Sequence, residues 1–361
     1  MSMARIRVLV VDDSLTVRKR LVEVLSTDPE LEVVGEAADG KLAIEMCGRL
    51  RPDVMTLDMV LPLMSGLAVT EYVMAHFATP IVIVSSSLNR GDVFKTLDAL
   101  AAGAVDVFEK PSGDYDERWD RDFIATVKLV SRIRVITHPR AKLRGVPLAA
   151  PLAQPRPAPR TGKQAGPVIA IGASTGGPAA LVQIFRALPA DFPIPILLTI
   201  HIGSAFAPAF IEWLDSQSSL RVAFAQQDQP LPRLGQPGVV VAPADRHLII
   251  EGGALRLSNA PERHSCRPSV DVMFDSVARE IGANAVACLM TGMGRDGAEG
   301  LLAVRRAGGH TLAQDEASSV VFGMNREAIQ LDAARDVLSL DKIAPAFVAL
   351  ARAWPAQGGL S

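Results

Sequence analysis

The feature that most constrains this chain is a proline-rich stretch near its middle. Residues 131–166 contain six prolines and eight lysine or arginine residues, but no aspartate or glutamate. Alternating alanine and proline cannot build a helix or pair in a sheet, so the expected structure is a semi-extended linker. The linker divides the 361 residues into a predicted N-terminal domain, residues 1–130, and a predicted C-terminal domain, residues 167–355.

Both domains alternate short apolar runs with segments of helical periodicity, for example a helix expected over residues 14–25. This alternation predicts doubly wound parallel sheets, with functional residues at the carboxyl ends of the strands. A β-hairpin is also expected, where residues 247–250 turn into residues 254–257. The expected parallel strands are residues 7–12, 32–37, 53–58, 80–85 and 104–110, followed by 168–172, 194–201, 221–226, 284–291 and 310–314.

The overall charge and the cysteine content exclude several protein classes. A net charge of −2 leaves no basic excess to hold nucleic acid or an anionic membrane. The cysteines are too few and too scattered for a disulfide framework or a zinc site, so the reducing cytoplasm is the expected compartment. They are Cys47, Cys266 and Cys288.

Membrane insertion and export are not expected either. The long uncharged stretches 164–185 and 192–211 are interrupted by glycine and proline, as in buried parallel strands joined by tight turns. The apolar run at residues 8–11 is too short for the hydrophobic segment of a signal peptide. We therefore expect both uncharged stretches to belong to a protein core.

Polar residues fall at the predicted strand ends of the N-terminal domain. Like-charged carboxylates this close need a counter-ion, and Mg²⁺ prefers oxygen ligands. With an ammonium and a hydroxyl group beside them, they suit transient phosphorylation of one carboxylate. The alternative for any single aspartate is a helix N-cap. The residues are Asp12, Asp13, Asp58, Ser85 and Lys110.

This order of residues resembles the two-component receiver domain over residues 4–130. The matching pattern is Val-Asp-Asp-Ser, then Asp58 with Pro62 and Gly66 behind it, then Ser85, then Lys110-Pro111. Pro111 is expected in a tight turn that could be cis.

The receiver resemblance assigns a role to each polar residue. It implies that Asp58 accepts phosphate from a histidine kinase. It further implies that Mg²⁺ is bound by Asp12, Asp13 and Asp58. Ser85 and Lys110 would contact the phosphoryl group, with Ser86 and Ser87 as neighbouring alternatives to Ser85.

The C-terminal domain places Ser174 in a glycine-rich turn before a predicted helix. The sequence Gly172-Ala173-Ser174-Thr175-Gly176 matches the G-x-S-x-G pattern of a nucleophile elbow. A turn at a helix N-terminus favours negative charge, so it suits a serine nucleophile, a bound phosphate or a dinucleotide. The pattern alone leaves these alternatives open.

Two further strand ends favour the nucleophile. His201 ends the next apolar strand and Asp296 follows a later one, so both are expected beside Ser174 as base and orienting carboxylate. The order Ser, His, Asp argues against the α/β-hydrolase superfamily. A dinucleotide-binding fold requires the pattern G-x-G-x-x-G, which this turn lacks. It also requires an acidic residue at the position where this chain has His201. For each residue alone, a structural role remains the alternative.

Several segments between residues 167 and 354 resemble the chemotaxis protein-glutamate methylesterase domain. The resemblance implies a triad of Ser174, His201 and Asp296. It also implies that the backbone N–H of Met293 contributes to an oxyanion hole, and we expect the N–H of Thr175 to be a second donor. The matching segments are residues 171–178, His201, 267–271, 291–297, 314–316 and 321–324.

The family usually has proline after Gly-Met, where this chain has Asn325. Asparagine can cap a helix, so we expect Asn325 to cap the helix that follows, with no loss of chemistry.

The predicted fold class is therefore α/β. Two doubly wound parallel-sheet domains, one flavodoxin-like and one Rossmann-like with three layers and a β-hairpin, are joined by the proline-rich linker. The resemblance implies hydrolysis of glutamate methyl esters and deamidation of glutamines on methyl-accepting chemotaxis receptors. We expect a monomer that needs no cofactor for ester hydrolysis. The receiver is expected to cover the active site until it is phosphorylated. The alternative is a phosphorylation-controlled binding module without turnover.

Overall fold

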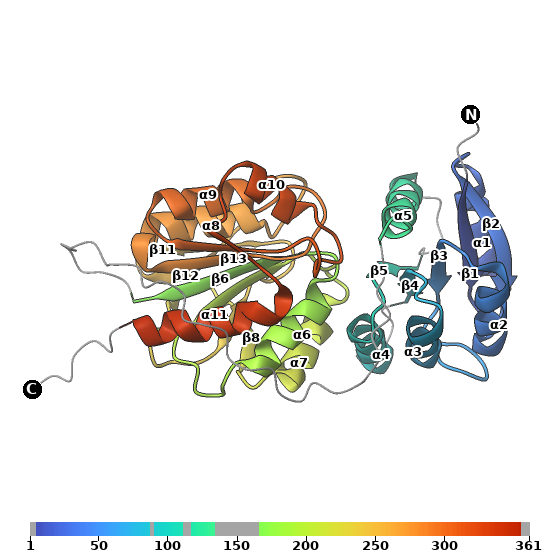
Figure 1. The fold of residues 1–361 in the computed structure, drawn as a ribbon, viewed down its shortest axis with the longest axis horizontal. Coiled ribbons are helices and arrows are strands. Elements are labelled where there is room, and N and C mark those ends of the chain that lie inside the picture. Colours follow the sequence, from blue (N-terminus) through green and yellow to red (C-terminus); the bar gives the residue numbers. More distant parts are fainter. Residues whose placement is uncertain (1–4, 87–89, 111–116, 134–165, 355–361) are drawn as a thin grey trace, which may run out of the picture.

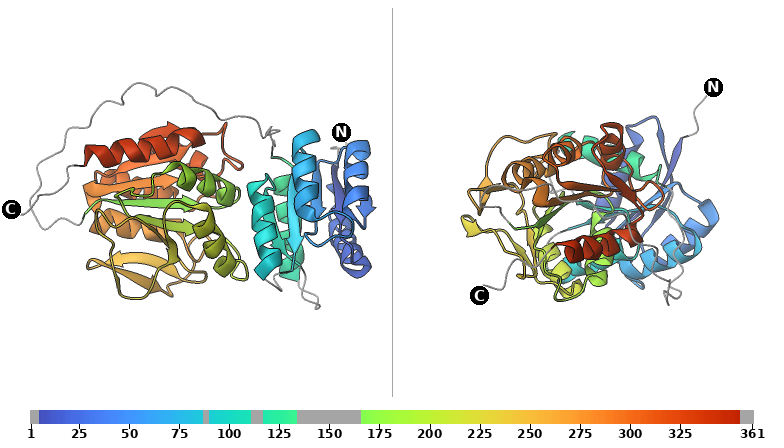
Figure 2. Two further views of the ribbon diagram at one scale, coloured as in Figure 1. Left: turned by 90° about the horizontal axis from the view of Figure 1, so that it is seen from below. Right: turned by 60° about the vertical axis from the view of Figure 1, so that its left-hand side comes forward.

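The computed structural model describes residues 5–86, 90–110, 117–133 and 166–354 (Figure 1). The predicted linker lies mostly outside the described residues, as do Ser87 and Pro111. Two parallel sheets are present, one on each side of the linker, and each has helices on both faces (Figures 1 and 2). The predicted α/β fold class is confirmed.

The N-terminal domain has a five-stranded parallel sheet in the order β2-β1-β3-β4-β5. This is the flavodoxin-like order, which brings the carboxyl ends of β1 and β3 side by side. Helices α1 and α5 cover one face of the sheet, and α2, α3 and α4 cover the other. The elements are β1 Ile6–Val11, α1 Leu15–Ser26, β2 Leu31–Ala37, α2 Gly40–Leu50, β3 Val54–Leu57, α3 Gly66–His76, β4 Ile81–Ser85, α4 Arg90–Ala101, β5 Asp106–Glu109 and α5 Glu117–Val130.

Local sequence explains how these helices begin. Three of them start after a residue whose side-chain oxygen accepts a backbone N–H of the first turn, namely Ser14, Asp39 and Ser65. Such N-caps satisfy donors that a helix leaves unpaired at its start. The helix expected over residues 14–25 is α1, and the five expected strands are β1 to β5 with ends shifted by a few residues.

The C-terminal domain has a seven-stranded parallel sheet in the order β15-β14-β13-β6-β7-β10-β8. Helices α6, α7 and α11 pack on one face, and α8, α9 and α10 pack on the other, which makes three layers. Its parallel strands are β6 Val168–Ala173, β7 Ile196–Ile200, β8 Val222–Phe224, β10 Val239–Val241, β13 Ala285–Leu289, β14 His310–Gln314 and β15 Asp336–Leu338.

A small antiparallel sheet, β11-β12-β9, lies beside this core and contains the predicted hairpin. Its strands are β9 Gln229–Pro230, β11 His247–Glu251 and β12 Ala254–Ser258. The helices of the domain are α6 Gly177–Ala187, α7 Ala207–Gln217, α8 Val270–Glu280, the 3₁₀ turn η1 Gly282–Asn284, α9 Ala298–Arg306, α10 Met324–Gln330 and α11 Leu340–Ala353.

The sequence pattern did not predict every strand. Strand β10 is fully buried and pairs with both β7 and β8, yet it has only three residues, Val239–Val241. An apolar run that short falls below the length at which periodicity separates strand from loop. Strand β15 is equally short and was not expected either.

The two domains contact each other through α4 of the first and α6 and α7 of the second. The buried Trp213 on α7 donates its indole N–H to Asp98 Oδ1 on α4 at 2.9 Å. Apolar side chains of α4 and α7 belong to one continuous buried cluster. The N-terminal domain therefore packs on the helices that follow β6 and β7.

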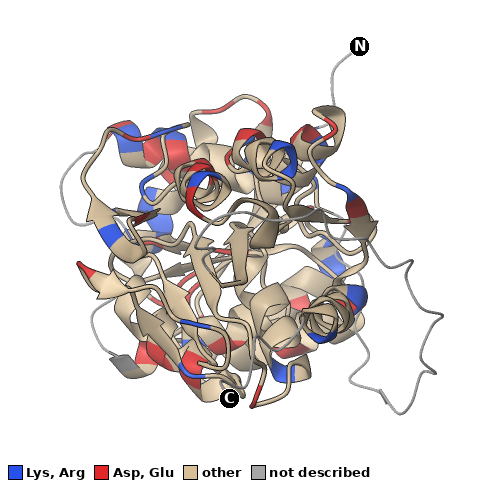
Figure 3. Cartoon of the chain, turned by 90° about the vertical axis from the view of Figure 1, so that its left-hand side faces the viewer, with Lys and Arg blue, Asp and Glu red and all other residues tan. Residues whose placement is uncertain are grey.

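Two surface properties bear on possible partners. Acidic and basic positions lie interspersed on the face of the C-terminal domain drawn in Figure 3, in keeping with the small net charge. Among the helices of the described residues, none combines the length and apolarity that crossing a bilayer requires.

Candidate active site

The three residues of the predicted triad come from neighbouring strand ends. Strand β6 lies between β13 and β7, and Ala173 on β6 pairs in register with Ile200 on β7. Ser174 directly follows β6 and His201 directly follows β7. His201 N donates to Ala173 O at 3.1 Å. Ser174 N in turn donates to the carbonyl of Thr291, just beyond β13, at 3.0 Å. The sheet thus brings together segments far apart in sequence.

The turn that carries Ser174 depends on glycine. Gly176 has φ +78° and forms the N-cap of α6, a left-handed conformation that glycine adopts without a steric penalty. Gly292 lies so close to Ser174 that a Cβ on it would be 2.8 Å from Ser174 Cβ. Side chains at either position would disturb the loop geometry around the serine.

His201 and Asp296 contact each other directly. The imidazole Nε2 lies 2.9 Å from Asp296 Oδ2. Asp296 is 2% exposed, whereas the His201 side chain is 19% exposed. An imidazole held by a buried carboxylate and open on its other side is suited to accept a proton.

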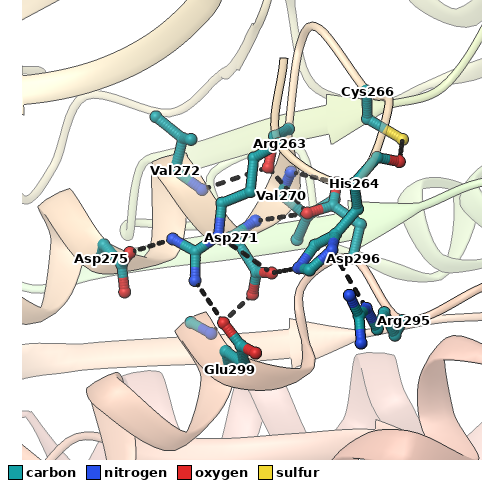
Figure 4. A network of polar contacts seen from close by, with 12 residues as sticks. Arg263, His264, Cys266, Val270, Asp271, Val272, Asp275, Arg295, Asp296 and Glu299 are labelled. Atoms are coloured by element: carbon teal, nitrogen blue, oxygen red, sulfur yellow. Dashed lines mark hydrogen bonds and ion pairs between the residues drawn. The ribbon is translucent and has the colours of Figure 1, made fainter. Parts of the chain in front are cut away.

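The Asp296 carboxylate is held by the N-terminus of α8 (Figure 4). Its Oδ1 accepts hydrogen bonds from Ser269 Oγ at 2.7 Å and Asp271 N at 3.1 Å. Its Oδ2 accepts from Val270 N at 2.7 Å in addition to the His201 contact. A helix N-terminus stabilises negative charge, so this arrangement favours the ionised carboxylate.

These contacts move the pKa values of both partners. Burial alone would raise the pKa of Asp296, but the hydrogen bonds from His201, Ser269 and Asp271 N outweigh it and lower the pKa. Burial alone would lower the pKa of His201, but Asp296 and Cys266 outweigh it and raise the pKa to about 9. The pair therefore favours imidazolium beside carboxylate.

Ser174 and His201 follow neighbouring strands, but their side chains are not hydrogen-bonded to each other in this structure. Among the hydrogen bonds of the described residues, none joins the Ser174 hydroxyl to the imidazole. His201 Nδ1 instead faces the Cys266 thiol, with Nδ1 and Sγ 3.9 Å apart. Catalytic hydrogen bonds often tighten only when substrate binds. A hollow of about 310 Å³ lies beside His201 and is lined by residues 201–203 and 265–268.

Two backbone N–H groups lie close to Ser174. In the described part of the chain, no backbone acceptor is assigned to the N–H of Thr175 or to that of Met293. Thr175 follows Ser174 directly, and Met293 follows Gly292, which touches Ser174. Met293 is 54% exposed, so the loop that carries it is accessible from solvent.

The loop carrying Cys266 is braced by charged residues (Figure 4). Arg263 pairs with Asp275 at 2.5 Å and with Glu299 at 2.7 Å, and it also lies 3.6 Å from the buried Asp271. His264 Nε2 lies 3.1 Å from Asp271 Oδ2. Mainly because it is buried, the Asp271 carboxyl has a pKa raised to about 6. These ion pairs connect the loop to α8 and α9.

The first domain gathers its predicted residues at a second site. Lys110 Nζ lies 2.9 Å from Asp12 Oδ2 and 2.8 Å from Asp58 Oδ2. Asp12 and Asp58 are buried, and burial raises the pKa of both carboxyls although Lys110 opposes it. Ser85 ends β4 at the same edge, and its carbonyl accepts the N–H of Lys110 at 3.0 Å.

The carboxylates of this second site fit a hard divalent cation. Oxygen atoms of Asp12, Asp13 and Asp58 lie within 4.8 Å of one another. Asp13 is exposed, which leaves this side of the site open to water. An all-oxygen set with room for water is the environment that Mg²⁺ prefers.

The expectation that Asn325 caps the helix after it is wrong. Helix α10 begins at Met324 and its N-cap is Gly323. The N–H groups of Gly323 and Met324 both donate to the carbonyl of Gly292, at 3.1 and 3.0 Å. Because this carbonyl already anchors the start of the helix, Asn325 lies inside it, where Nδ2 donates to Ser319 Oγ at 3.2 Å.

Sequence reasoning assigned no role to Ser269 or Cys266. Ser269 lies in a segment that matched a family motif, and a serine followed by a helical pattern signals an N-cap. That signal indicates the cap but not the contact with Asp296. The approach of Cys266 to His201 comes from chain folding, and no spacing in the sequence indicates it.

Comparisons with known proteins agree with this division. Residues 8–117 match the family model described as response regulator receiver domain, and residues 169–347 match the one described as CheB methylesterase. The fold and the two matches define a response regulator whose effector domain is a methylesterase domain.

Relatives extend the match to nearly the whole chain. A "Protein-glutamate methylesterase/protein-glutamine glutaminase 2" from Anaeromyxobacter dehalogenans is 42% identical, covering 96% of this chain and 97% of that protein. A protein-glutamate methylesterase/protein-glutamine glutaminase from Nitrosospira multiformis is also 42% identical, covering 96% and 97%. The crystal structure of the Thermotoga maritima CheB methylesterase catalytic domain is 34% identical, with a TM-score of 0.48, covering 52% of this chain and 99% of that one. The chain belongs to the protein-glutamate methylesterase/protein-glutamine glutaminase family.

Proposed function

We propose that this protein hydrolyses methyl esters of glutamate side chains on chemoreceptors, releasing methanol, and also deamidates receptor glutamines. Family membership supports the activity. The observation that carries the chemistry is the 2.9 Å contact between His201 and the buried Asp296, at the strand end next to Ser174. Esters and amides share the tetrahedral route, so one set of residues can serve both reactions.

In the proposed acylation step, Ser174 attacks the ester carbonyl. Because Nε2 of His201 is committed to Asp296, Nδ1 takes the hydroxyl proton and delivers it to the leaving methoxide. The N–H groups of Thr175 and Met293 stabilise the oxyanion. Loss of one such donor typically costs roughly 100–1000-fold in turnover.

Hydrolysis of the acyl-enzyme uses the same groups in reverse. His201 removes a proton from water, which attacks the acyl carbonyl, and the proton then returns to Ser174 as glutamate leaves. Asp296 stays ionised throughout because the N-terminus of α8 and Ser269 hold its charge. Its role is to orient the imidazole and stabilise its cation.

Ser174→Ala tests this assignment directly. Loss of a triad nucleophile typically lowers turnover on the order of 10⁴–10⁶-fold. The assay counts methanol released from radiolabelled, methylated receptor membranes, and a melting curve checks the fold. Ser216→Ala, near the C-terminal end of α7, is the control and should keep the rate. Full turnover by Ser174→Ala would refute the serine mechanism.

We also propose that the receiver restrains the esterase until Asp58 is phosphorylated. Asp106 Oδ2 on β5 accepts a hydrogen bond from Thr175 Oγ1 at 3.0 Å, directly beside the proposed nucleophile. Helix α4, which begins five residues after Ser85, packs on α6 and α7. When bound at Asp12, Asp13 and Asp58, Mg²⁺ would neutralise the incoming phosphoryl charge.

Asp58→Asn tests the regulation separately from the chemistry. This variant should keep its basal hydrolysis but lose the stimulation that a small phosphodonor gives the wild-type chain. A variant still stimulated by the phosphodonor would show that Asp58 is not the phosphoacceptor.

A further inference from the structure

The active site contains a thiol that the proposed ester hydrolysis does not use. Cys266 is partly exposed, and its Sγ lies 3.9 Å from His201 Nδ1 at the wall of the 310 Å³ hollow. Ligand atoms of Cys266, His201 and Asp296 all lie within 4.8 Å of one another. Thiolate sulfur and imidazole nitrogen are the donors that Zn²⁺ prefers.

The hydrogen bonding of the imidazole prepares it as a metal ligand. Nε2–H donates to Asp296 Oδ2, so Nδ1 faces Cys266 and presents its lone pair there once the Nδ1 proton has left. A carboxylate that fixes the tautomer of a ligating histidine recurs around protein-bound zinc. Both Asp296 oxygens already accept hydrogen bonds, so Asp296 serves as this outer partner.

The separation of the two donor atoms fits one ion. Zn–S of about 2.3 Å and Zn–N of about 2.05 Å at a tetrahedral angle place sulfur and nitrogen about 3.6 Å apart. The observed 3.9 Å needs only a small closure. The loop is braced for this, because Cys266 and Arg263 exchange two backbone hydrogen bonds, at 3.0 and 3.2 Å, and Arg263 is tied to Asp275 and Glu299.

We propose that Cys266 and His201 bind a thiophilic divalent cation of the Zn²⁺ type, and that bound metal inhibits ester hydrolysis. Binding forms the Sγ–metal and Nδ1–metal bonds and releases two protons to solvent, one from the thiol and one from Nδ1 of the imidazolium, while water fills the remaining positions. The metal occupies the lone pair that must accept the Ser174 proton. Inhibition therefore rests on the proposed function of His201, whereas binding does not.

The neighbouring group of His264, Asp271 and Glu299 is a weaker metal candidate. Arg263 already pairs with Asp271 and Glu299, and Arg295 Nε donates to His264 Nδ1 at 3.1 Å. A cation there would have to displace these positive charges. The few, scattered cysteines argued against a zinc site in the sequence. The fold nevertheless brings the imidazole of His201 next to Cys266, which gives the site a second ligand.

The experiment uses the full chain with excess Mg²⁺ and a phosphodonor, so that the receiver site is equally loaded in every arm. Binding is measured with Co²⁺ alone, which gives a near-ultraviolet charge-transfer band when a thiolate ligates it. We expect one equivalent of Co²⁺ to produce the band and Zn²⁺ to displace it. Cys266→Ser should lack the band, and Cys47→Ser, altered at a buried receiver cysteine, should keep it.

Inhibition is measured as the ratio of methanol release with and without Zn²⁺ in each variant. Zn²⁺ should lower the wild-type rate by roughly 100-fold or more, since a positioned general base contributes on the order of 10²–10⁴-fold, and a chelator should restore it. The ratio should approach one in Cys266→Ser. The proposed metal site is wrong if the Co²⁺ band is absent. It is also wrong if Zn²⁺ inhibits Cys266→Ser as strongly as it inhibits the wild-type chain. A Cys266-dependent band with undiminished hydrolysis instead refutes His201 as the base.

Discussion

Thr175 donates its hydroxyl to Asp106 across the domain boundary, with the two oxygens 3.0 Å apart. Thr175 follows the proposed nucleophile, and Asp106 begins the last strand of the receiver sheet. Asp106 and Thr175 are both partly buried, and desolvation raises the pKa of the Asp106 carboxyl although the hydrogen bond from Thr175 opposes it. The receiver thus touches the loop on which the proposed chemistry depends.

Asp106→Ala should raise hydrolysis by the unphosphorylated chain. A net hydrogen bond contributes about 1 kcal/mol, so its loss should shift a closed–open equilibrium by up to about 5-fold. Methanol release without phosphodonor measures the effect. Asp122→Ala, an exposed carboxylate on α5, is the control and should not change the basal rate. An unchanged or lower rate in Asp106→Ala would contradict restraint through this contact.

The pH profile should report the raised pKa of His201. Only the neutral imidazole accepts the Ser174 proton, so a pKa raised to about 9 means that kcat/KM should climb with pH well beyond 7. Cys266→Ser should move the midpoint to lower pH, because Cys266 contributes to the raised value. A midpoint at the ordinary histidine value of about 6.5 would count against this environment.

Ser269→Ala should impair both stability and catalysis. Its hydroxyl caps α8 and donates to Asp296, so its loss should cost about 1 kcal/mol of folding free energy and lower kcat by roughly 10-fold. Ser65→Ala removes the equivalent cap from α3 in the receiver and should cost stability alone. Urea unfolding and methanol release separate the two effects. Equal kcat values in the two variants would show that Ser269 does not position Asp296.

Removal of Mg²⁺ should destabilise the receiver. An ion that binds only the folded chain stabilises it by about 1.4 kcal/mol at 10 times its Kd. The melting midpoint should therefore rise with Mg²⁺ in the wild-type chain and much less in Asp13→Asn, which removes the exposed carboxylate of the set. Asp122→Asn again serves as the control. A Mg²⁺ effect of the same size in Asp13→Asn would exclude Asp13 as a ligand.

Local sequence pattern by itself predicts most of the parallel strands of this protein and the strand ends at which its functional residues lie. The apolar runs and the turn residues indicated the parallel strands, and the rule that function gathers at strand carboxyl ends placed Ser174, His201 and Asp296 together. Helical periodicity over residues 14–25 indicated α1, which the structure has at Leu15–Ser26. These features act over a few residues, so the sequence displays them directly.

Tertiary structure decided the contacts between segments distant along the chain. The N-terminus of α8 meets Asp296 only because the sheet places β13 beside β6, and no local pattern specifies which helix approaches a given strand end. The start of α10 uses the carbonyl of Gly292, which is why Asn325 does not act as a cap. Cys266 reaches His201, and Asp106 reaches Thr175, for the same reason: packing of whole elements sets these distances, and spacing in the sequence does not encode them.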